Sequence, residues 1–354
     1  MRLFIFFTLI VFAKLSLAQN EELFLRSDNT SRIEGVINDL RNNHQSHLDE
    51  YKNEPRLVRL TQSYFINYSL LTDFELVNSG NVLFNKELDA FFKKMVAEIN
   101  ATNNLQKFNV YVLNTTQINA FATDNGSIFF TMGLLARLNT EAEVAAVLCH
   151  EIAHFQLKHN TKGFTRKIKS HLELEPFGQE NENKFEQVEY HNYSQELELE
   201  ADSLGFKYLA NAGYNPSVFI DVFDVLSNSG LPQKPDNFNF TIPATEIDIR
   251  TNFDSVAIEA FNSDSIKSFE SATHPSLNAR EDLNKILINS RGNISNGAYE
   301  KVLSTGEFKN LVEKVNYTLA ETFLLEKNAI EGFCHHLLLT EKYEKDAFIG
   351  KCLA

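Results

Sequence analysis

The chain has 354 residues, of which 43% are apolar and 23% charged, and its formal net charge is −14. This length and apolar content can bury one large core or two smaller ones, so the sequence predicts a globular protein rather than a disordered one. The acidic balance repels phosphate groups, which argues against partners made of nucleic acid and against docking on anionic lipid.

The first 18 residues have the three-part pattern of a secretory signal peptide. Arg2 gives a positive start, an apolar stretch of eleven residues runs from Leu3 to Ala13, and Ser16-Leu17-Ala18 fits the small residues needed for cleavage. The alternative is a retained anchor, but a membrane-spanning helix needs about 17–25 apolar residues. We therefore expect an exported protein, periplasmic or secreted, without stable membrane insertion.

The cysteines and the sequons are weak signals. Cys149, Cys334 and Cys352 are too few for a disulfide scaffold, and an odd number leaves at least one thiol unpaired. Cys334 and Cys352 either pair or remain two free thiols. Nine Asn-x-Ser/Thr sequons occur, Asn125 among them, and they matter only in a eukaryotic secretory pathway.

Regular patterns begin after a mixed N-terminal segment, residues 19–80. Residues 85–99 carry apolar side chains at helical spacing. Three strand-like runs follow, at 108–113, 118–123 and 127–131. Because Asn125-Gly126 between the last two is typical of a hairpin turn, these runs predict a small antiparallel sheet.

A helix is expected directly after this sheet. Thr140 and Glu143 have the spacing of a capping box, which predicts a helix from this point to about His159. Residues 160–193 are charged and poor in apolar side chains, and we interpret them as a surface insertion.

The rest of the chain is also mainly helical in pattern. A second helix is expected over about 194–212, because Gly213 suits the position just past a helix end. Pro216 opens a third helix that reaches about Ser229, and the tail from about 296 to 354 carries further helical periodicity.

Within the helix after Thr140, His150 and His154 are four residues apart, so both imidazoles lie on one face and can reach the same ion. Glu151 projects beside them, which completes the H-E-x-x-H arrangement of zinc peptidases. The alternative is that both histidines are core residues bonded to the backbone. Burying three titratable groups in this apolar helix without a strong partner would cost several kcal/mol, which favours a metal.

A zinc site needs a third protein ligand, and the second helix offers acidic candidates. Glu198 and Asp202 are four residues apart and share a face. If Glu198 binds the metal, Asp202 can accept a hydrogen bond from the far nitrogen of a ligand histidine. Glu196 and Glu200 are rival ligands by composition, and an acidic run can also be a solvated helix face.

At this point the chain resembles the zinc metalloprotease family that includes HtpX, the CAAX prenyl proteases, the mitochondrial Oma-type proteases and soluble periplasmic proteases of outer-membrane protein assembly. Five stretches carry the resemblance, in the family's order: Ile118-Asn-Ala-Phe-Ala122, Ile128-Phe-Phe-Thr-Met-Gly-Leu-Leu135, His150-Glu-Ile-Ala-His154, Glu198-Leu-Glu-Ala-Asp202 and Thr273-His-Pro-Ser-Leu-Asn-Ala-Arg280. The absence of spanning helices makes it most similar to the soluble exported branch.

The resemblance implies an α+β fold that is mainly helical, with a zincin-type metalloprotease domain and a small antiparallel sheet beside the active-site helix. The domain would cover residues 81–290, between the N-terminal segment and a helical C-terminal segment, 291–354, that can recruit protein partners. It implies one Zn²⁺ per chain, held by His150, His154 and Glu198, with Asp202 supporting a ligand.

The resemblance also implies how substrate and catalyst meet. Asn119 and Ala120 would lie on an edge strand where an extended polypeptide adds as another strand. Glu151 would take a proton from a zinc-activated water and pass it to the leaving amine. His274 would act as a latch or as a donor to the oxyanion, and the alternative is a turn histidine before Pro275.

The sequence thus predicts a zinc metalloendopeptidase that hydrolyses peptide bonds in exported, unfolded or misassembled proteins. The alternative is a zinc-stabilised peptide-binding or chaperone-like module with little proteolysis. Glu151 discriminates between them, because a pure binding site needs no base there. Cys149, one residue before the first ligand, is turned off the ligand face and is interpreted as a small buried side chain.

Overall fold

The structure, a computed structural model, describes residues 24–27, 32–106, 108–162, 182–230, 277–290 and 300–326, with several residues between 332 and 339. The predicted signal peptide and His274 lie outside these residues. The chain divides into two compact units. The larger unit comprises Arg26–Ser227 and Thr273–Lys309, and the smaller contains the remaining residues.

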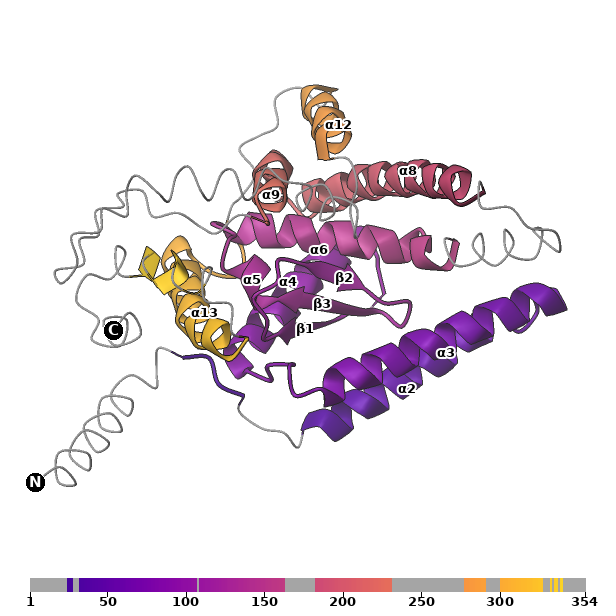
Figure 1. The fold of residues 1–354 in the computed structure, drawn as a ribbon, viewed down its shortest axis with the longest axis horizontal. Coiled ribbons are helices and arrows are strands. Elements are labelled where there is room, and N and C mark those ends of the chain that lie inside the picture. Colours follow the sequence, from indigo (N-terminus) through magenta and orange to yellow (C-terminus); the bar gives the residue numbers. More distant parts are fainter. Residues whose placement is uncertain are drawn as a thin grey trace, which may run out of the picture. The chain divides into compact units, whose positions relative to one another are not determined.

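The larger unit is mainly helical and holds one small sheet, which confirms the predicted α+β class. Its helices are α2 (Arg32–Glu50), α3 (Arg56–Asn78), α4 (Lys86–Asn103), α5 (Met132–Leu135), α6 (Glu141–Gln156), α8 (Glu182–Asn211), α9 (Val218–Ser227) and α12 (Leu277–Ser290). Its strands are β1 (Asn109–Leu113), β2 (Ala120–Ala122) and β3 (Ser127–Thr131). Helix α6 lies between the sheet and α8 (Figure 1).

The sheet is mixed, so the prediction of an antiparallel sheet was wrong for one strand. β3 is central, β2 pairs with it antiparallel on one side, and β1 pairs with it parallel on the other. The β2–β3 hairpin is confirmed, with Gly126 at a positive φ of 76° in its turn. The strand predicted at 108–113 is present as β1, but an alternating apolar pattern identifies neither the partner nor the direction of a strand, which is why its parallel pairing was not predicted.

Apolar residues cover both faces of the sheet. On one face Leu40 of α2 and Val77 of α3 form a core with Tyr111 and Phe129. On the other face Phe92 of α4 packs against Phe130, with ring centroids 5.3 Å apart. β3 is buried at every position. Helices α2 and α3 thus help to anchor the sheet, although the sequence patterns did not identify them.

Helix α6 starts where the capping box predicts it. The Thr140 hydroxyl accepts the Glu143 N–H at 3.3 Å, and the Glu143 carboxylate reaches back to accept the N–H of Asn139 at 2.8 Å and the Thr140 hydroxyl at 2.9 Å. The helix ends at Gln156, before the predicted His159, because Lys158 adopts a left-handed conformation with φ of 54°. Residues 159–162 are helical again after this break.

Helix α8 begins at Glu182, well before the predicted start near residue 194. Part of the predicted surface insertion is therefore helical, because glutamate, lysine and glutamine favour helices even without an apolar stripe. The helix ends before Gly213, which takes the expected positive φ of 79°. The third predicted helix is confirmed as α9.

The smaller unit contains most of helix α13 (Thr305–Leu325), which lies within the predicted C-terminal helical segment. The N–H of Leu25 donates to Thr318 Oγ1 at 2.8 Å, so the start of the described chain is bonded to this helix. Nowhere in the described parts of the chain is a helix both long and apolar enough to cross a bilayer.

Candidate metal and catalytic site

Helices α6 and α8 pack closely because a glycine lies at their contact. A Cβ atom at Gly205 of α8 would be only 3.1 Å from the Cα and N atoms of His150. Glu198 and Asp202 precede this glycine by seven and three residues, so all three lie on the face of α8 that contacts α6. The tight packing brings both carboxylates to the histidines.

Three potential ligand side chains converge between these helices. The Nε2 atoms of His150 and His154 are 3.0 Å apart, and the two carboxylate oxygens of Glu198 lie 3.4 Å from His150 Nε2 and from His154 Nε2. A tetrahedral site with metal–ligand distances of about 2.0–2.1 Å has ligand atoms separated by about 3.3 Å. The predicted meeting of a distant carboxylate with the imidazole pair is therefore present, and its spacing fits zinc.

The rival acidic residues do not join this group. Glu198 is 3% exposed, whereas Glu196 and Glu200 are exposed. The Cys149 thiol is fully buried, and burial raises its pKa, so it is an uncharged side chain outside the ligand group.

The other nitrogen of His150 meets Asp202, at 2.9 Å from Oδ1. Asp202 is fully buried and also accepts two hydrogen bonds from Arg280, from Nε at 2.7 Å and from Nη2 at 2.8 Å. Arg280 Nη1 lies 3.0 Å from a Glu198 oxygen. Arg280 ends the predicted His-Pro stretch, where sequence reasoning assigned it no role.

The charges at this site set its protonation. Burial and the Arg280 charge lower the pKa of His150, but hydrogen bonds to Asp202 and Glu198 outweigh them and raise it to about 9. Burial and the His150 charge hold the pKa of His154 below its usual range. Burial would raise the pKa of Asp202, but the Arg280 guanidinium holds it below its usual range. The metal-free histidine pair thus carries a proton that a metal must displace.

The other nitrogen of His154 meets a residue that sequence reasoning missed. His159 Nδ1 lies 3.0 Å from His154 Nδ1, and His159 Nε2 lies 3.1 Å from a Glu200 oxygen. The two histidines are five positions apart, which is not a same-face spacing on a continuous helix, so the break at Lys158 is what brings them together.

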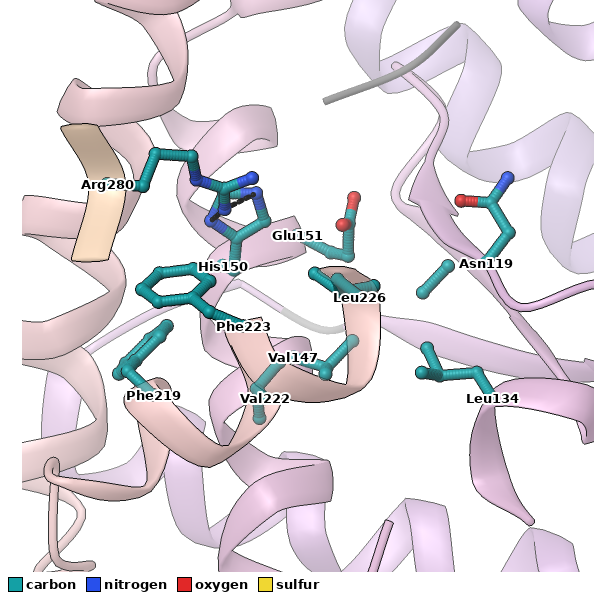
Figure 2. Close-up of a pocket in the computed structure, with 11 residues that line it drawn as sticks. Asn119, Leu134, Val147, His150, Glu151, Phe219, Val222, Phe223, Leu226 and Arg280 are labelled. Carbon is teal, nitrogen blue, oxygen red and sulfur yellow. Dashed lines mark hydrogen bonds between the residues drawn. The ribbon is translucent and has the colours of Figure 1, made fainter. Parts of the chain in front are cut away.

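Glu151 lies at the junction of the ligand helix and the sheet. Its carboxylate is 4% exposed and accepts a hydrogen bond from the N–H of Ala122 in β2, at 3.1 Å. Figure 2 shows Glu151 between His150 and Asn119. Asn119 and Ala120, which the resemblance places on the substrate strand, line the same pocket as His150 and Glu151.

This pocket is partly open, and the space between its walls, open solvent included, is about 390 Å³. Its polar wall holds His150, Glu151, Asn119 and Arg280. Its remaining wall is mostly apolar and is contributed largely by α6 and α9 (Figure 2): Leu134, Val147, Phe219, Val222, Phe223 and Leu226.

Two histidines and a carboxylate on packed helices, with a further carboxylate beside them, define a metal-dependent peptidase type of site. The chain belongs to Peptidase family M48, whose profile matches residues 83–285, more than half of the chain.

Curated relatives show the same similarity. The chain is 30% identical over 173 residues to mitochondrial metalloendopeptidase OMA1 of Arabidopsis thaliana, covering 45% of this chain and 34% of that protein. It is 25% identical over 183 residues to the beta-barrel assembly-enhancing protease of Yersinia pestis, covering 46% and 36%. It is 32% identical over 96 residues to a protease HtpX homolog of Thermoanaerobacter pseudethanolicus, covering 26% and 32%. The chain thus spans about a third of the length of each relative.

Proposed function

We propose that this chain is a zinc-dependent endopeptidase. The observation that carries the proposal is the convergence of three ligand side chains, in which the Nε2 atoms of His150 and His154 are 3.0 Å apart and each lies 3.4 Å from an oxygen of Glu198. Membership of Peptidase family M48 supports it. When bound, zinc would supply an acidified water and a Lewis acid to polarise the scissile carbonyl.

Glu151 is the proposed general base. One of its oxygens is held by the Ala122 N–H, which fixes the carboxylate between the ligand histidines and the edge strand. The other oxygen can take a proton and return it to the leaving amine. We propose His274, outside the described residues, as a further donor to the oxyanion.

An extended polypeptide is the substrate that β2 suits. β2 is an edge strand, and the backbone groups of Asn119 and Thr123 hydrogen-bond to β3. Because successive residues of a strand point their backbone groups to opposite sides, those of Ala120 point away from β3, to the open edge. The outward groups of Ala122 are already used by Glu151 and by the Asn160 side chain, at 3.1 Å each. A substrate strand would therefore pair beside Ala120 and stop before Ala122.

The neighbouring pocket suits an apolar side chain of the substrate, because Val147, Phe219 and Phe223 are among the residues that line it. We propose that the natural substrates are exported polypeptides that expose such side chains when unfolded or misassembled. The signal-like pattern of residues 1–18 supports this location. To test this location, the exported fraction of expressing cells would be searched for the chain, and the mass of the recovered chain would be measured.

Metal analysis and a casein cleavage assay, each with and without a chelator, test the function. We expect about one zinc per chain and cleavage that the chelator abolishes and added zinc restores. Glu151→Gln should keep the zinc and lose cleavage by about 10²-fold or more. A Glu151→Gln protein that still cleaves casein would refute the assignment, and a wild-type chain that holds zinc without cleaving would point to a binding module.

A further inference from the structure

His159 occupies a position in the molecule that the proposed reaction does not use. It is 3% exposed, although it follows the exposed Lys158. Its Nδ1 lies 3.0 Å from Nδ1 of His154, and its Nε2 lies 3.1 Å from Glu200 Oε2. His154 is therefore contacted at both nitrogens, by the ligand group at Nε2 and by His159 at Nδ1.

The chain reaches this arrangement by interrupting helix α6. On an uninterrupted helix, His159 would point about 140° away from His154 around the axis. Instead α6 ends at Gln156, Lys158 takes a φ of 54°, and helical geometry resumes at His159. A lysine is unfavourable in the left-handed region, so the surrounding contacts must hold this turn in place.

The hydrogen-bond chain has one consistent assignment once His154 uses Nε2 as a metal ligand. A neutral imidazole then carries its hydrogen on Nδ1, so His154 Nδ1–H donates to His159 Nδ1. His159 must carry its own hydrogen on Nε2, which donates to Glu200 Oε2. We infer that His159 is a positioning residue that holds His154 as the tautomer able to bind zinc. This inference rests on the proposed zinc site.

The two ligand histidines are thus supported in different ways. His150 is backed by Asp202, a fully buried carboxylate that Arg280 fixes. His154 is backed by a neutral imidazole whose own partner, the Glu200 side chain, is 55% exposed. Partners of this kind orient a ligand ring, and their loss usually weakens metal binding by about 10–100-fold.

Zinc affinity of the full chain, measured by competition with a chromophoric chelator, tests this role. His159→Phe keeps a flat ring but removes both hydrogen bonds, and we expect zinc affinity to fall about 10–100-fold. His159→Asn places an amide oxygen where Nδ1 stood, so it should recover much of that loss. Glu200→Ala should lower the affinity several-fold, because His159 then loses the group that orients it.

Thr161→Val is the matched control. Thr161 lies in the same turn, and its hydroxyl donates to Asp124 Oδ1 at 3.0 Å. If the turn matters only for folding, His159→Phe and Thr161→Val will both destabilise the metal-free chain and leave zinc affinity unchanged, which overturns the inference. An unchanged affinity in His159→Phe, or no recovery in His159→Asn, overturns it as well.

The outcomes separate this inference from the proposed function. A wild-type chain that binds no zinc overturns both. A wild-type chain that binds zinc, with His159→Phe binding it equally well, overturns only the role of His159. Should His159→Phe fail to fold, His159→Asn and Glu200→Ala decide the matter, because wild-type affinity in both variants contradicts a positioning role.

Discussion

Two buried polar networks in the larger unit use carboxylates in opposite ways. In the first, between α6 and α8, Glu198 and Asp202 face the histidine pair and one guanidinium, that of Arg280. In the second, Asp73 of α3 meets the β2–β3 turn. Its Oδ2 accepts hydrogen bonds from Thr123, Asn125 and Ser127, each at 3.2 Å.

The difference lies in what balances the charge. Three neutral donors serve one oxygen of Asp73, and its Oδ1 is buried without a hydrogen-bond partner in the described residues, so this network connects helix and turn without a cation. The network at α6 holds Glu151, Glu198 and Asp202 against Arg280 and the one proton that the metal-free histidine pair carries, so its carboxylates still outnumber its positive charges. An excess of acceptors in a buried place is what a divalent cation resolves.

Removing Arg280 should break the first network most severely. Arg280→Met leaves Asp202 and Glu198 buried without their guanidinium, and we expect the metal-free chain to lose about 3–5 kcal/mol of unfolding free energy in urea. Added zinc should recover part of this loss, because it returns positive charge to the site. Lys285→Met on the same helix breaks only an exposed pair with Glu281 and should change little. Equal effects of the two substitutions would contradict the charge argument.

The second network predicts a pH dependence of its own. Burial raises the pKa of Asp73 to about 6, against the hydrogen bonds that would lower it. The folded chain therefore holds the proton more tightly than the unfolded chain. The stability that Asp73 contributes is fully present below about pH 4 and is lost as the pH rises through 6, by up to about 3 kcal/mol.

Asp73→Asn cannot ionise, so this part of the decline should disappear from its urea unfolding curves between pH 4 and 7. Asp39→Asn, an exposed change on α2, serves as the control and should keep the wild-type decline. An Asp73→Asn protein with the wild-type pH profile would show that the carboxyl is already ionised at pH 4.

Much of the metal network was predictable because it depends on local spacing. His150 with His154, and Glu198 with Asp202, are each four residues apart, so a shared face follows from helix geometry alone. The meeting of the two pairs depends on the packing of α6 on α8, which only the family resemblance predicted. Gly205, which permits the close approach of the two helices, was not identified from the sequence.

The second network and the support of His154 could not be predicted in this way. Asp73 meets partners about fifty residues away in sequence, and no periodic pattern marks such a pair. His159 reaches His154 only because Lys158 adopts a conformation that glycine or asparagine would normally signal. Asn125 has the sequence of a glycosylation site, yet its side chain is fully buried and donates to Leu40 O at 3.1 Å, so a glycan there is incompatible with this fold.

Gly205 tests whether the spacing of the two helices sets the metal site. In Gly205→Val the added side chain meets the backbone of His150, and we expect a loss of about 1–3 kcal/mol in unfolding free energy. Because Glu198 moves with α8, zinc affinity should fall as well. Gly35→Val on α2, where no atom lies within 4 Å, should leave zinc affinity unchanged. Wild-type zinc affinity in Gly205→Val would show that the site tolerates a shift of α8.

Lys158 joins the two networks, because the turn that it starts places His159 on His154 and Thr161 on Asp124, in the turn beside Asp73. Its φ of 54° is unfavourable for a residue other than glycine or asparagine.

The Lys158 ammonium group contacts Glu50 at 3.1 Å and Tyr51 at 3.0 Å on a half-exposed surface, where such contacts contribute at most about 1 kcal/mol. Lys158→Met loses these contacts and keeps the strain, whereas Lys158→Gly loses both. Lys158→Gly should therefore be more stable than Lys158→Met by about 1 kcal/mol in urea unfolding, with zinc affinity equal in the two. If Lys158→Met proves the more stable, the left-handed conformation at residue 158 is not strained, and other contacts fix the turn between the two networks.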